Sequence, residues 1–495
     1  MFGQLLEGFL NVMTPKILSF LVLGVIGGIA IGSLPGLTAT MGVALLLPIT
    51  FGMDPVTGIL LLLGIYIGAI YGGSVSAILL RTPGTPAAAA TALDGFELAK
   101  RGEAGRALGI STIASFGGGV ISTVFLITIA PFLAKMALKF SAPEYFALAF
   151  FGLSIISSIS GKSLLKGLIV GVLGLLASTV GMDPMTSHPR FTFGNVNLLN
   201  GFSFIPVMIG LFGLSQALTN IEESVSNVKV EQKVIRVLPT PSDIKRILGT
   251  VIRSGILGTF IGSIPGAGAD IAAFVSYNEA KRWSRNPDRF GTGLIEGIAA
   301  PEAGNNGVTG GAMIPLLTLG VPGDAVTAIL LGALMIQGLQ PGPLLFKEHS
   351  GLVYTLFSGL LIGNFIMLVV GLLGIRLFIK VLSVPKYLLT PIIFLLCFIG
   401  SYAINNSFFD VGVMLLSGII GYVFMKLDFP ASPIVLALIL GPMAESNLRR
   451  SLIMSGGNIF ILFTRPIAAI LLFFGIVTLL APIFRDLFKR RPTTK

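Results

Sequence analysis

The sequence is poor in the residues that carry catalysis and metal binding. Its 495 residues include one cysteine, Cys397, and two histidines, His188 and His349. A single cysteine excludes an intrachain disulfide and a cysteine-based metal site. The histidines lie far apart, outside any metal-binding motif, and neither H-E-x-x-H nor G-x-x-x-x-G-K-[ST] occurs. We therefore expect neither an intramembrane enzyme nor an ATPase, and no cofactor beyond a coupling ion.

Charge is scarce as well. Only 11% of the residues are charged and 54% are hydrophobic, whereas a soluble domain carries about 25% charged residues. Such a chain has too little polar surface to be soluble, so we predict an all-α, multi-pass membrane protein. The N-terminal residues MFGQLLEGFLNVMTPK lack a basic segment and a cleavage site, so we expect no removable signal peptide.

The net charge of +11 arises from basic residues in short loops beside apolar segments, a pattern typical of cytoplasmic loops. It predicts that the polar loop 94–106 is cytoplasmic. Apolar segments predict about 12 transmembrane helices plus interrupted segments. The expected division is a first transmembrane repeat at 1–221, a cytoplasmic linker at 222–246, a second repeat at 247–484 and a basic cytoplasmic tail at 485–495.

Two copies of one motif organise the chain. G-x-x-x-G-S-[LI]-P-G occurs at residues 28–36 and again, close to half the chain further on, at 258–266. A second Pro-Gly pair follows each copy, at Pro83-Gly84 and at Pro322-Gly323. Proline removes a backbone donor, and glycine accepts dihedrals that other residues avoid. Because broken helices at matching places in two halves are typical of transporter binding sites, we predict broken or re-entrant helices at these motifs.

The relative orientation of the two repeats is a further expectation. A basic loop follows the second Pro-Gly pair in the first half, at 100–106, but precedes that pair in the second half, at 281–289. This shift favours inverted repeats, with parallel repeats as the alternative.

Long segments of the sequence resemble the large membrane subunit, the TctA family, of the tripartite tricarboxylate transporters. The resemblance is carried by LPGLTATMGVALLLPITFGMDP, YGGSVSAILLRTPGTPAAAATALDGFELAKRGEAGRALG, IPGAGADIAAFVSYNEAK and GTGLIEGIAAPEAGNNGVTGGAMIPLLTLGVPGDAVTAILLGAL. It implies a secondary active transporter of the bacterial inner membrane that imports citrate or another organic carboxylate with sodium ions or protons. It also implies a small membrane partner subunit and a periplasmic solute-binding protein. A homodimer is possible.

The Pro-Gly breaks are the candidate substrate site, because a helix N-terminus offers unpaired N–H groups and a positive dipole end to an anion. The alternative is that the glycines only allow close helix packing. The candidates at the first pair of breaks are Ser33, Pro35, Gly36, Leu37, Thr38, Ala39, Thr40, Ser263, Pro265, Gly266, Ala267, Gly268 and Ala269. Those at the second pair are Arg81, Thr82, Pro83, Gly84, Thr85, Pro322 and Gly323. Arg81 could pair with a substrate carboxylate or mark the membrane edge.

Acidic and amide side chains near the second-half breaks are the candidate ion-coupling residues. Carboxylates within a membrane are costly and usually functional, which points to Asp270 and Asp324. The alternative for each is a helix N-cap. Glu302, Asn305, Asn306 and Thr309 offer oxygen ligands to a hard cation such as sodium, although their glycine-rich segment could also be a solvated loop.

The leading hypothesis is a carboxylate transporter that works by elevator-type alternating access. Segments with breaks cluster at 28–93 and 258–340, so they would move against the plain apolar spans at 107–220 and 351–484. The runner-up is an anion channel or uniporter without ion coupling, in which replacement of Asp270 leaves the flux intact.

Overall fold

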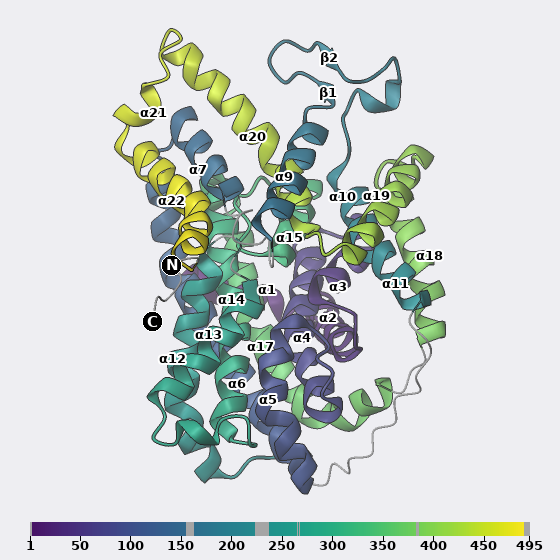
Figure 1. The fold of residues 1–495 in the computed structure, drawn as a ribbon, viewed down its shortest axis with the longest axis vertical. Coiled ribbons are helices and arrows are strands. Elements are labelled where there is room, and N and C mark those ends of the chain that lie inside the picture. Colours follow the sequence, from purple (N-terminus) through teal and green to yellow (C-terminus); the bar gives the residue numbers. More distant parts are fainter. Residues whose placement is uncertain are drawn as a thin grey trace, which may run out of the picture. The chain divides into compact units, whose positions relative to one another are not determined.

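The computed structural model describes residues 2–154, 163–222, 237–264, 266, 268–382 and 386–489. Regular structure in these residues is almost entirely helical (Figure 1). Strands β1 (Gly181–Met182) and β2 (Pro189–Arg190) form a short antiparallel pair. The predicted all-α class is therefore confirmed. Most of the predicted linker, the end of the basic tail, Pro265 and Ala267 lie outside the described residues.

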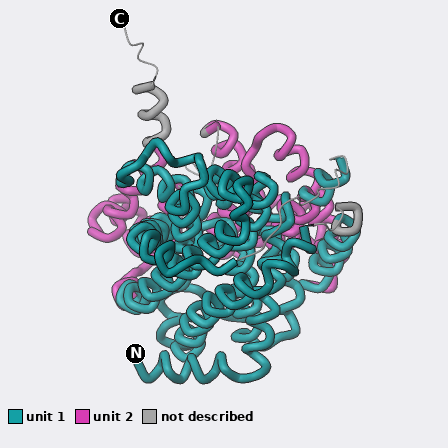
Figure 2. Tube along the Cα trace, turned by 90° about the horizontal axis from the view of Figure 1, so that it is seen from below, with its two compact units in different colours: residues 1–134, 216–404 teal, residues 135–215, 405–495 magenta. Residues whose placement is uncertain are grey.

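Contacts divide the chain into two compact units, which Figure 2 colours separately. Unit 1 contains residues 1–134 and 216–404, and unit 2 contains 135–215 and 405–495. Each unit thus draws on both halves of the sequence. All four Pro-Gly breaks lie in unit 1, together with residues 107–134, 216–220 and 351–404, which the sequence analysis assigns to a separate scaffold.

Unit 1 is built from helices of both repeats. In the first half these are α1 (Phe2–Val12), α2 (Pro15–Ser33), α3 (Ala39–Leu46), η1 (Leu47–Gly52), α4 (Pro55–Leu80), η2 (Pro86–Ala88), α5 (Ala89–Leu98), η3 (Ala99–Glu103) and most of α6 (Ala104–Ala137). In the second half they are most of α11 (Ser215–Glu222), α12 (Pro241–Ser263), α13 (Gly268–Trp283), η6 (Pro287–Arg289), α14 (Ile295–Leu319), α15 (Ala325–Ile336), α16 (Pro343–Glu348), α17 (Ser350–Val381) and most of α18 (Lys386–Asn405).

Unit 2 holds the remaining elements. They are α7 (Ala142–Ser154), α9 (Leu164–Ser178), β1, β2, η4 (Val196–Leu198), α10 (Phe204–Met208), η5 (Ile209–Leu214), α19 (Phe408–Lys426), α20 (Ser432–Met454), α21 (Ile461–Thr464) and α22 (Pro466–Lys489). Within this unit α20 packs on both α7 and α9, and η5 packs on α19.

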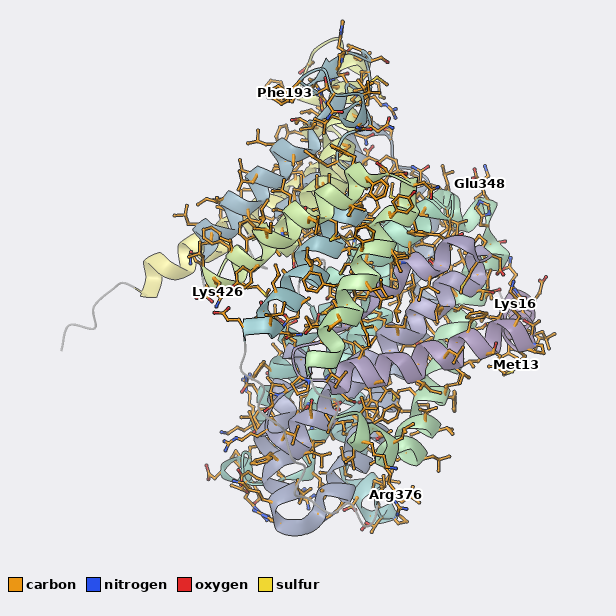
Figure 3. All side chains as sticks on the ribbon, turned by 90° about the vertical axis from the view of Figure 1, so that its right-hand side faces the viewer. Met13, Lys16, Phe193, Glu348, Arg376 and Lys426 are labelled. Carbon is orange, nitrogen blue, oxygen red and sulfur yellow. The ribbon has the colours of Figure 1, made fainter. Side chains whose placement is uncertain are left out.

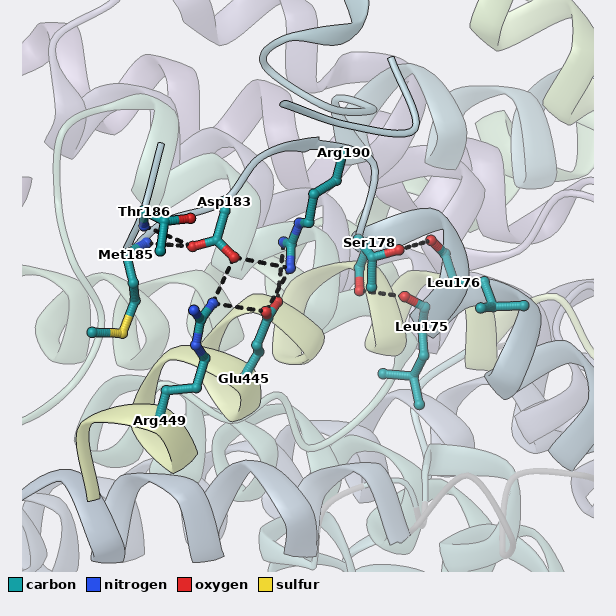
Figure 4. Close-up of polar contacts among 10 residues, drawn as sticks. Leu175, Leu176, Ser178, Asp183, Met185, Thr186, Arg190, Glu445 and Arg449 are labelled. Carbon is teal, nitrogen blue, oxygen red and sulfur yellow. Dashed lines mark hydrogen bonds and ion pairs between the residues drawn. The ribbon is translucent and has the colours of Figure 1, made fainter. Parts of the chain in front are cut away.

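The hairpin after α9 is fixed by ionic contacts to α20 (Figure 4). Arg190 Nη1 lies 2.6 Å from Glu445 Oε1, and Arg449 Nη1 lies 2.6 Å from Asp183 Oδ2. Beyond this cluster the loop exposes Phe193, with 90% of its surface accessible (Figure 3). The charged residues of this hairpin therefore pair with α20.

Six helical segments among the described residues are long and apolar enough to cross a membrane. They are Pro15–Ser33, Pro55–Leu80, Pro86–Ala137, Phe204–Glu222, Ser350–Val381 and Phe408–Lys426. Shorter apolar helices include Ala325–Ile336 and Pro466–Leu480. These findings support a multi-pass membrane protein, and the count of about 12 crossings stays a prediction.

The two halves repeat the same helix packing through glycine. In the first half α2 lies against α4, and a Cβ added to Gly28 would overlap the backbone of Ile65. In the second half α12 lies against α14, and a Cβ at Gly258 would overlap the backbone of Gly304. Backbones approach this closely only where side chains are absent. The glycines of the duplicated motif therefore do pack helices, as the alternative reading proposed.

Contacts between the halves are reciprocal. Helix α3, which follows the first break of the first half, packs on α15, which follows the second break of the second half. Likewise α13, after the first break of the second half, packs on η2 and α5, after the second break of the first half. Contacts that exchange partners in this way are the signature of a two-fold relation. The inverted orientation stays a prediction.

The segment 94–106, predicted as a polar loop, is helical instead, and so is most of the glycine-rich stretch 291–312, for which a solvated loop is the alternative. Residues 94–106 run from α5 through the π-helical turn η3 into α6, and Asp94 is fully buried. The glycine-rich stretch 291–312 forms most of α14, whose residues 297–318 are all buried. Local composition suggests solvated loops here, but neighbouring helices cover these polar side chains and satisfy most of them.

Candidate functional site

The first break of the first half separates α2 from α3. Gly36 has a φ of 90°, a conformation that strongly favours glycine. Thr38 caps α3 by accepting a hydrogen bond from Met41 N at 3.2 Å, whereas the Ser33 hydroxyl donates to Ile29 O within its own helix. A Cβ at Gly36 would lie 3.3 Å from Gln216 Nε2. The sequence analysis missed Gln216, since nothing local marks α11 as a neighbour of this turn.

The corresponding break of the second half separates α12 from α13. Gly266 and Gly268 have φ angles of 82° and 70°, so this turn also depends on glycine. Ser263 donates its hydroxyl to Phe260 O at 2.7 Å. Ala269 lies buried in the first turn of α13. Both predicted helix breaks are confirmed.

Within each half the two breaks meet. Gly84 lies so close to Gly32 that an added Cβ would overlap the Gly32 carbonyl oxygen. Gly323 lies close to Gly262 in the same way, and its carbonyl accepts a hydrogen bond from Gly266 N at 2.6 Å. The structure thus brings together backbone groups that lie far apart in the sequence. In each half, the candidate anion site therefore consists of the turn at the first Pro-Gly break and the turn at the second, packed against each other.

Arg81 is exposed rather than enclosed by the turns. It adopts a left-handed conformation with a φ of 57° at the end of α4. Its side chain is 62% exposed, lies 3.9 Å from Glu97 and stacks over Phe96. Exposure at a helix end favours the interpretation in which Arg81 marks the membrane edge. Thr82, beside it, donates only a long hydrogen bond of 3.4 Å to Leu80 O.

Glu302 is fully buried in α14 and is surrounded by hydroxyl groups. Thr91 donates to Oε1 at 2.5 Å, and Ser115 donates to Oε2 at 2.8 Å. Ser74 and Ser111, which hydrogen-bond to each other at 2.9 Å, also face this carboxyl group. Four hydroxyls on α4, α5 and α6 thus hold one acid of the second half.

The amide side chains next to Glu302 are buried but incompletely paired. Asn306 Nδ2 donates to Asn305 Oδ1 at 2.7 Å and to Glu302 O at 3.0 Å. Asn305 Nδ2 and Asn306 Oδ1 have no hydrogen-bond partner. Thr309 donates to Asn306 O at 2.7 Å. The solvated-loop alternative for this segment is therefore wrong, and unpaired buried groups of this kind call for a ligand or a water.

The two aspartates differ in setting. Asp324 is the N-cap of α15: Oδ1 accepts from Thr327 N at 2.8 Å, and Oδ2 accepts from Tyr66 Oη at 2.6 Å. The capping alternative is thus what the structure shows for Asp324. Asp270 lies exposed in the first turn of α13. The packing of unit 1 therefore does not enclose Asp270 as it encloses Asp324, and the ion-coupling role of Asp270 stays a prediction.

Asp94 is a buried acid that the sequence analysis missed. Its carboxylate accepts hydrogen bonds from the backbone N–H groups of Gly291, Gly293 and Leu294 at 2.7–2.9 Å. It also accepts from Tyr277 Oη at 2.9 Å. Asp94 therefore ties α5 of the first half to the loop that precedes α14. The signal was hidden because the segment around Asp94 is rich in charge and looks like a solvated loop.

Comparisons with known proteins decide the family. The model of the family described as "Tripartite tricarboxylate transporter TctA family" matches residues 18–436. The chain belongs to this family. It is also 40% identical over 484 residues to an Agrobacterium vitis protein, "Uncharacterized 52.8 kDa protein in TAR-I ttuC' 3'region", covering 98% of this chain and 96% of that protein. A second protein of that species, "Uncharacterized protein in TAR-II ttuC' 3'region", is 39% identical over 234 residues, which are 47% of this chain and 97% of that protein.

No solved structure matches this chain. Family membership indicates a role in transport rather than catalysis, in accord with the apolar helices. Of the candidate residues, Glu302 is an enclosed acid, and anion binding at the turns stays a prediction. Among the described residues, no three His, Cys, Asp or Glu side chains cluster in a way that could hold a metal ion.

Proposed function

We propose that this TctA-family chain is the large membrane subunit of a tripartite, binding-protein-dependent secondary active transporter. It imports an organic dicarboxylate or tricarboxylate, such as citrate, and is coupled to a sodium or proton gradient. The observation that supports this most strongly is the duplicated pair of helix breaks that meet within each half. Gly84 packs on Gly32, and Gly323 packs on Gly262.

Capture of the anion rests on neutral donors. Backbone turns at Gly36 and Gly266 interrupt apolar helices, and such turns persist in a membrane only where protein or water covers them. Helix N-termini and amide side chains stabilise a carboxylate without a buried cation. Arg81 is too exposed to dominate this binding.

Coupling rests on Glu302. Its contacts to Thr91 and Ser115 suit both the protonated acid and the carboxylate, because hydroxyls donate and accept. Oxygen atoms of Glu302, Asn305 and Asn306 also suit sodium, a hard cation. Either ion would neutralise the acid while an anion is bound nearby.

Alternating access is of the elevator type, with unit 1 carrying the substrate and unit 2 serving as the scaffold. Spin labels at Arg282 in unit 1 and Phe193 in unit 2, in a Cys397→Ser background, test this. Both side chains are exposed. The distribution of distances between the two labels, measured by double electron–electron resonance, should shift when citrate and sodium are added to the protein in liposomes. An unchanged distribution under active uptake would rule out motion between the units.

The partners are a small membrane subunit and a periplasmic solute-binding protein, and the complex lies in the bacterial inner membrane. The direct test is uptake of radiolabelled citrate, tartrate, malate and succinate into vesicles that contain both partner subunits. Each is measured with and without sodium and with and without a pH gradient. Accumulation of one of them against its gradient is expected. Flux that only equilibrates would favour the channel alternative, and no flux of any would refute the proposal.

A further inference from the structure

Thr85 and Asp324 occupy equivalent places in the two halves. Gly84 lies against Gly32 and Gly73, and Gly323 lies against Gly262 and Ala312. Gly73 precedes Gly84 by the same interval as Ala312 precedes Gly323, so the two pairs correspond. The next residue in each half is Thr85 or Asp324, and each is the N-cap of the helix that follows.

In the second half this place is filled by the chain itself. The Asp324 carboxylate accepts hydrogen bonds from Tyr66 Oη at 2.6 Å and from Thr327 Oγ1 at 2.7 Å. Tyr66 comes from α4 of the other half, so the contact joins the two repeats. The side chains of Tyr66, Asp324 and Thr327 form a trio in which each polar group has a hydrogen-bond partner.

In the first half the equivalent groups are unpaired. The alignment that matches Thr85 with Asp324 also matches Tyr66 with Asn305 and Ala88 with Thr327. Thr85 Oγ1 and Asn305 Nδ2 are both buried without a hydrogen-bond partner. Thr85 is 3% exposed and Asn305 is fully buried. Two donors thus remain unused where the other half has a complete carboxylate site.

The reciprocal contacts between the halves indicate that Thr85 and Asn305 lie near each other, because their counterparts Asp324 and Tyr66 are hydrogen-bonded. Leu294 N donates a hydrogen bond to Asp94, and further along α14 Glu302 accepts one from Thr91, which precedes Asp94 on α5. Residue numbers fall on α5 as they rise on α14, so the helices run antiparallel here. Continuing in this direction leads from Glu302 to Asn305 on α14, and from Thr91 toward η2, the short helix that Thr85 caps. Contacts between α14 and η2 agree with this course.

We propose that a carboxylate group of the transported anion binds beside Thr85 and Asn305 in the first half. It would occupy the position that corresponds to the Asp324 carboxylate in the second half. It accepts hydrogen bonds from Asn305 Nδ2 and Thr85 Oγ1. This deepens the proposed function and rests on it. It also gives the amide nitrogen of Asn305 a substrate-binding role, beside the ion-coupling role proposed for its amide oxygen. Thr85, unlike an aspartate, supplies a donor to the anion and does not repel it. The negative charge of Asp324 excludes an anion from the corresponding position of the second half.

The test places an aspartate carboxylate at the proposed site by the substitution Thr85→Asp. Thr85→Asp should fold with a melting temperature close to that of the wild type, because Asn305 donates to the new carboxylate. It should lose uptake of whichever of citrate, tartrate, malate and succinate the wild type accumulates. Wild-type KM in Thr85→Asp would overturn the inference while leaving the proposed function intact. Failure of the wild type to accumulate any of the four would instead defeat the proposed function.

Smaller changes keep the test decisive if Thr85→Asp does not fold. Thr85→Val and Asn305→Leu each remove one donor to a charged group, so KM should rise about tenfold with maximal rate little changed. Thr318→Val is the matched control, since Thr318 is buried in α14 and donates to Ile314 O within its own helix. Tyr66→Phe disrupts the second-half trio and should lower the melting temperature without raising KM. Equal KM in Thr85→Val, Asn305→Leu and the control would overturn the inference.

Discussion

Thr91 donates its hydroxyl to Glu302 across 2.5 Å, although the two residues belong to different halves of the sequence. The contact joins α5 of the first repeat to α14 of the second. It places an acid of one half among hydroxyls of the other. Neutralisation of Glu302 by a proton or a cation would therefore change hydrogen bonds that join the two repeats.

Glu302→Gln should uncouple uptake from the ion gradient. The amide cannot exchange a proton and holds a cation less well, but Thr91 and Ser115 can still hydrogen-bond to it. Accumulation of substrate above the external concentration should be lost, because the ion gradient no longer drives uptake, while exchange of internal for external substrate persists. The matched control is Glu296→Gln at the start of the same helix, where Glu296 pairs with Arg246. Unchanged accumulation in Glu302→Gln would exclude Glu302 as the coupling group.

Gly28→Ala should destabilise the protein, because the new Cβ would overlap the backbone of Ile65. The expected cost is about 1–3 kcal/mol, seen as a lower melting temperature in detergent. Gly27→Ala, one residue away, is the control, since nothing lies within 4 Å of its Cβ. The second repeat offers the same comparison with Gly258→Ala and Gly249→Ala. Equal melting temperatures within either pair would contradict the packing described for that half.

Asp94→Ala should be among the most destabilising single changes in unit 1. It leaves the buried N–H of Leu294 and those of Gly291 and Gly293 without an acceptor. We expect a loss of about 3–5 kcal/mol, as for the loss of one partner of a buried charged group. Asp288→Ala, on the exposed turn η6, should have little effect. Thermal unfolding of the two variants in one detergent makes the comparison, and equal melting temperatures would refute the structural role of Asp94.

The hairpin of unit 2 should lose stability only in acid. A hydrogen bond from Arg449, followed by those from Thr186 N and Met185 N, holds the pKa of Asp183 well below its usual value of 3.8. Because the pKa is lower in the folded state, this stability is present in full above about pH 4. It declines as the pH falls further.

Arg449→Met tests this assignment. It should lower the melting temperature at pH 7, and the difference from the wild type should shrink as the pH falls below about 4. Arg450→Met, on the neighbouring exposed residue, should match the wild type throughout. A difference for Arg449→Met that stays constant from neutral pH into acid would contradict the assignment.

The sequence by itself determined the class of the protein and the position of its helix breaks. Scarce charge and long apolar runs leave no alternative to a membrane-embedded helical fold. A proline followed by a glycine interrupts a helix whatever surrounds it, so the turns at Gly36 and Gly266 were predictable from local chemistry. The motif was long and duplicated enough to reveal the repeat and the family.

Only the tertiary structure decided which polar groups are paired. Asp94 looked like part of a solvated loop, Asp270 looked enclosed, and Asn305 looked equivalent to Asn306 until their neighbours were known. The burial and hydrogen-bond partners of such side chains come from the other half of the sequence, as Thr91 and Glu302 show. A local pattern states which donors and acceptors a segment carries, but the packing of distant helices determines which of them are satisfied and which are left for a ligand.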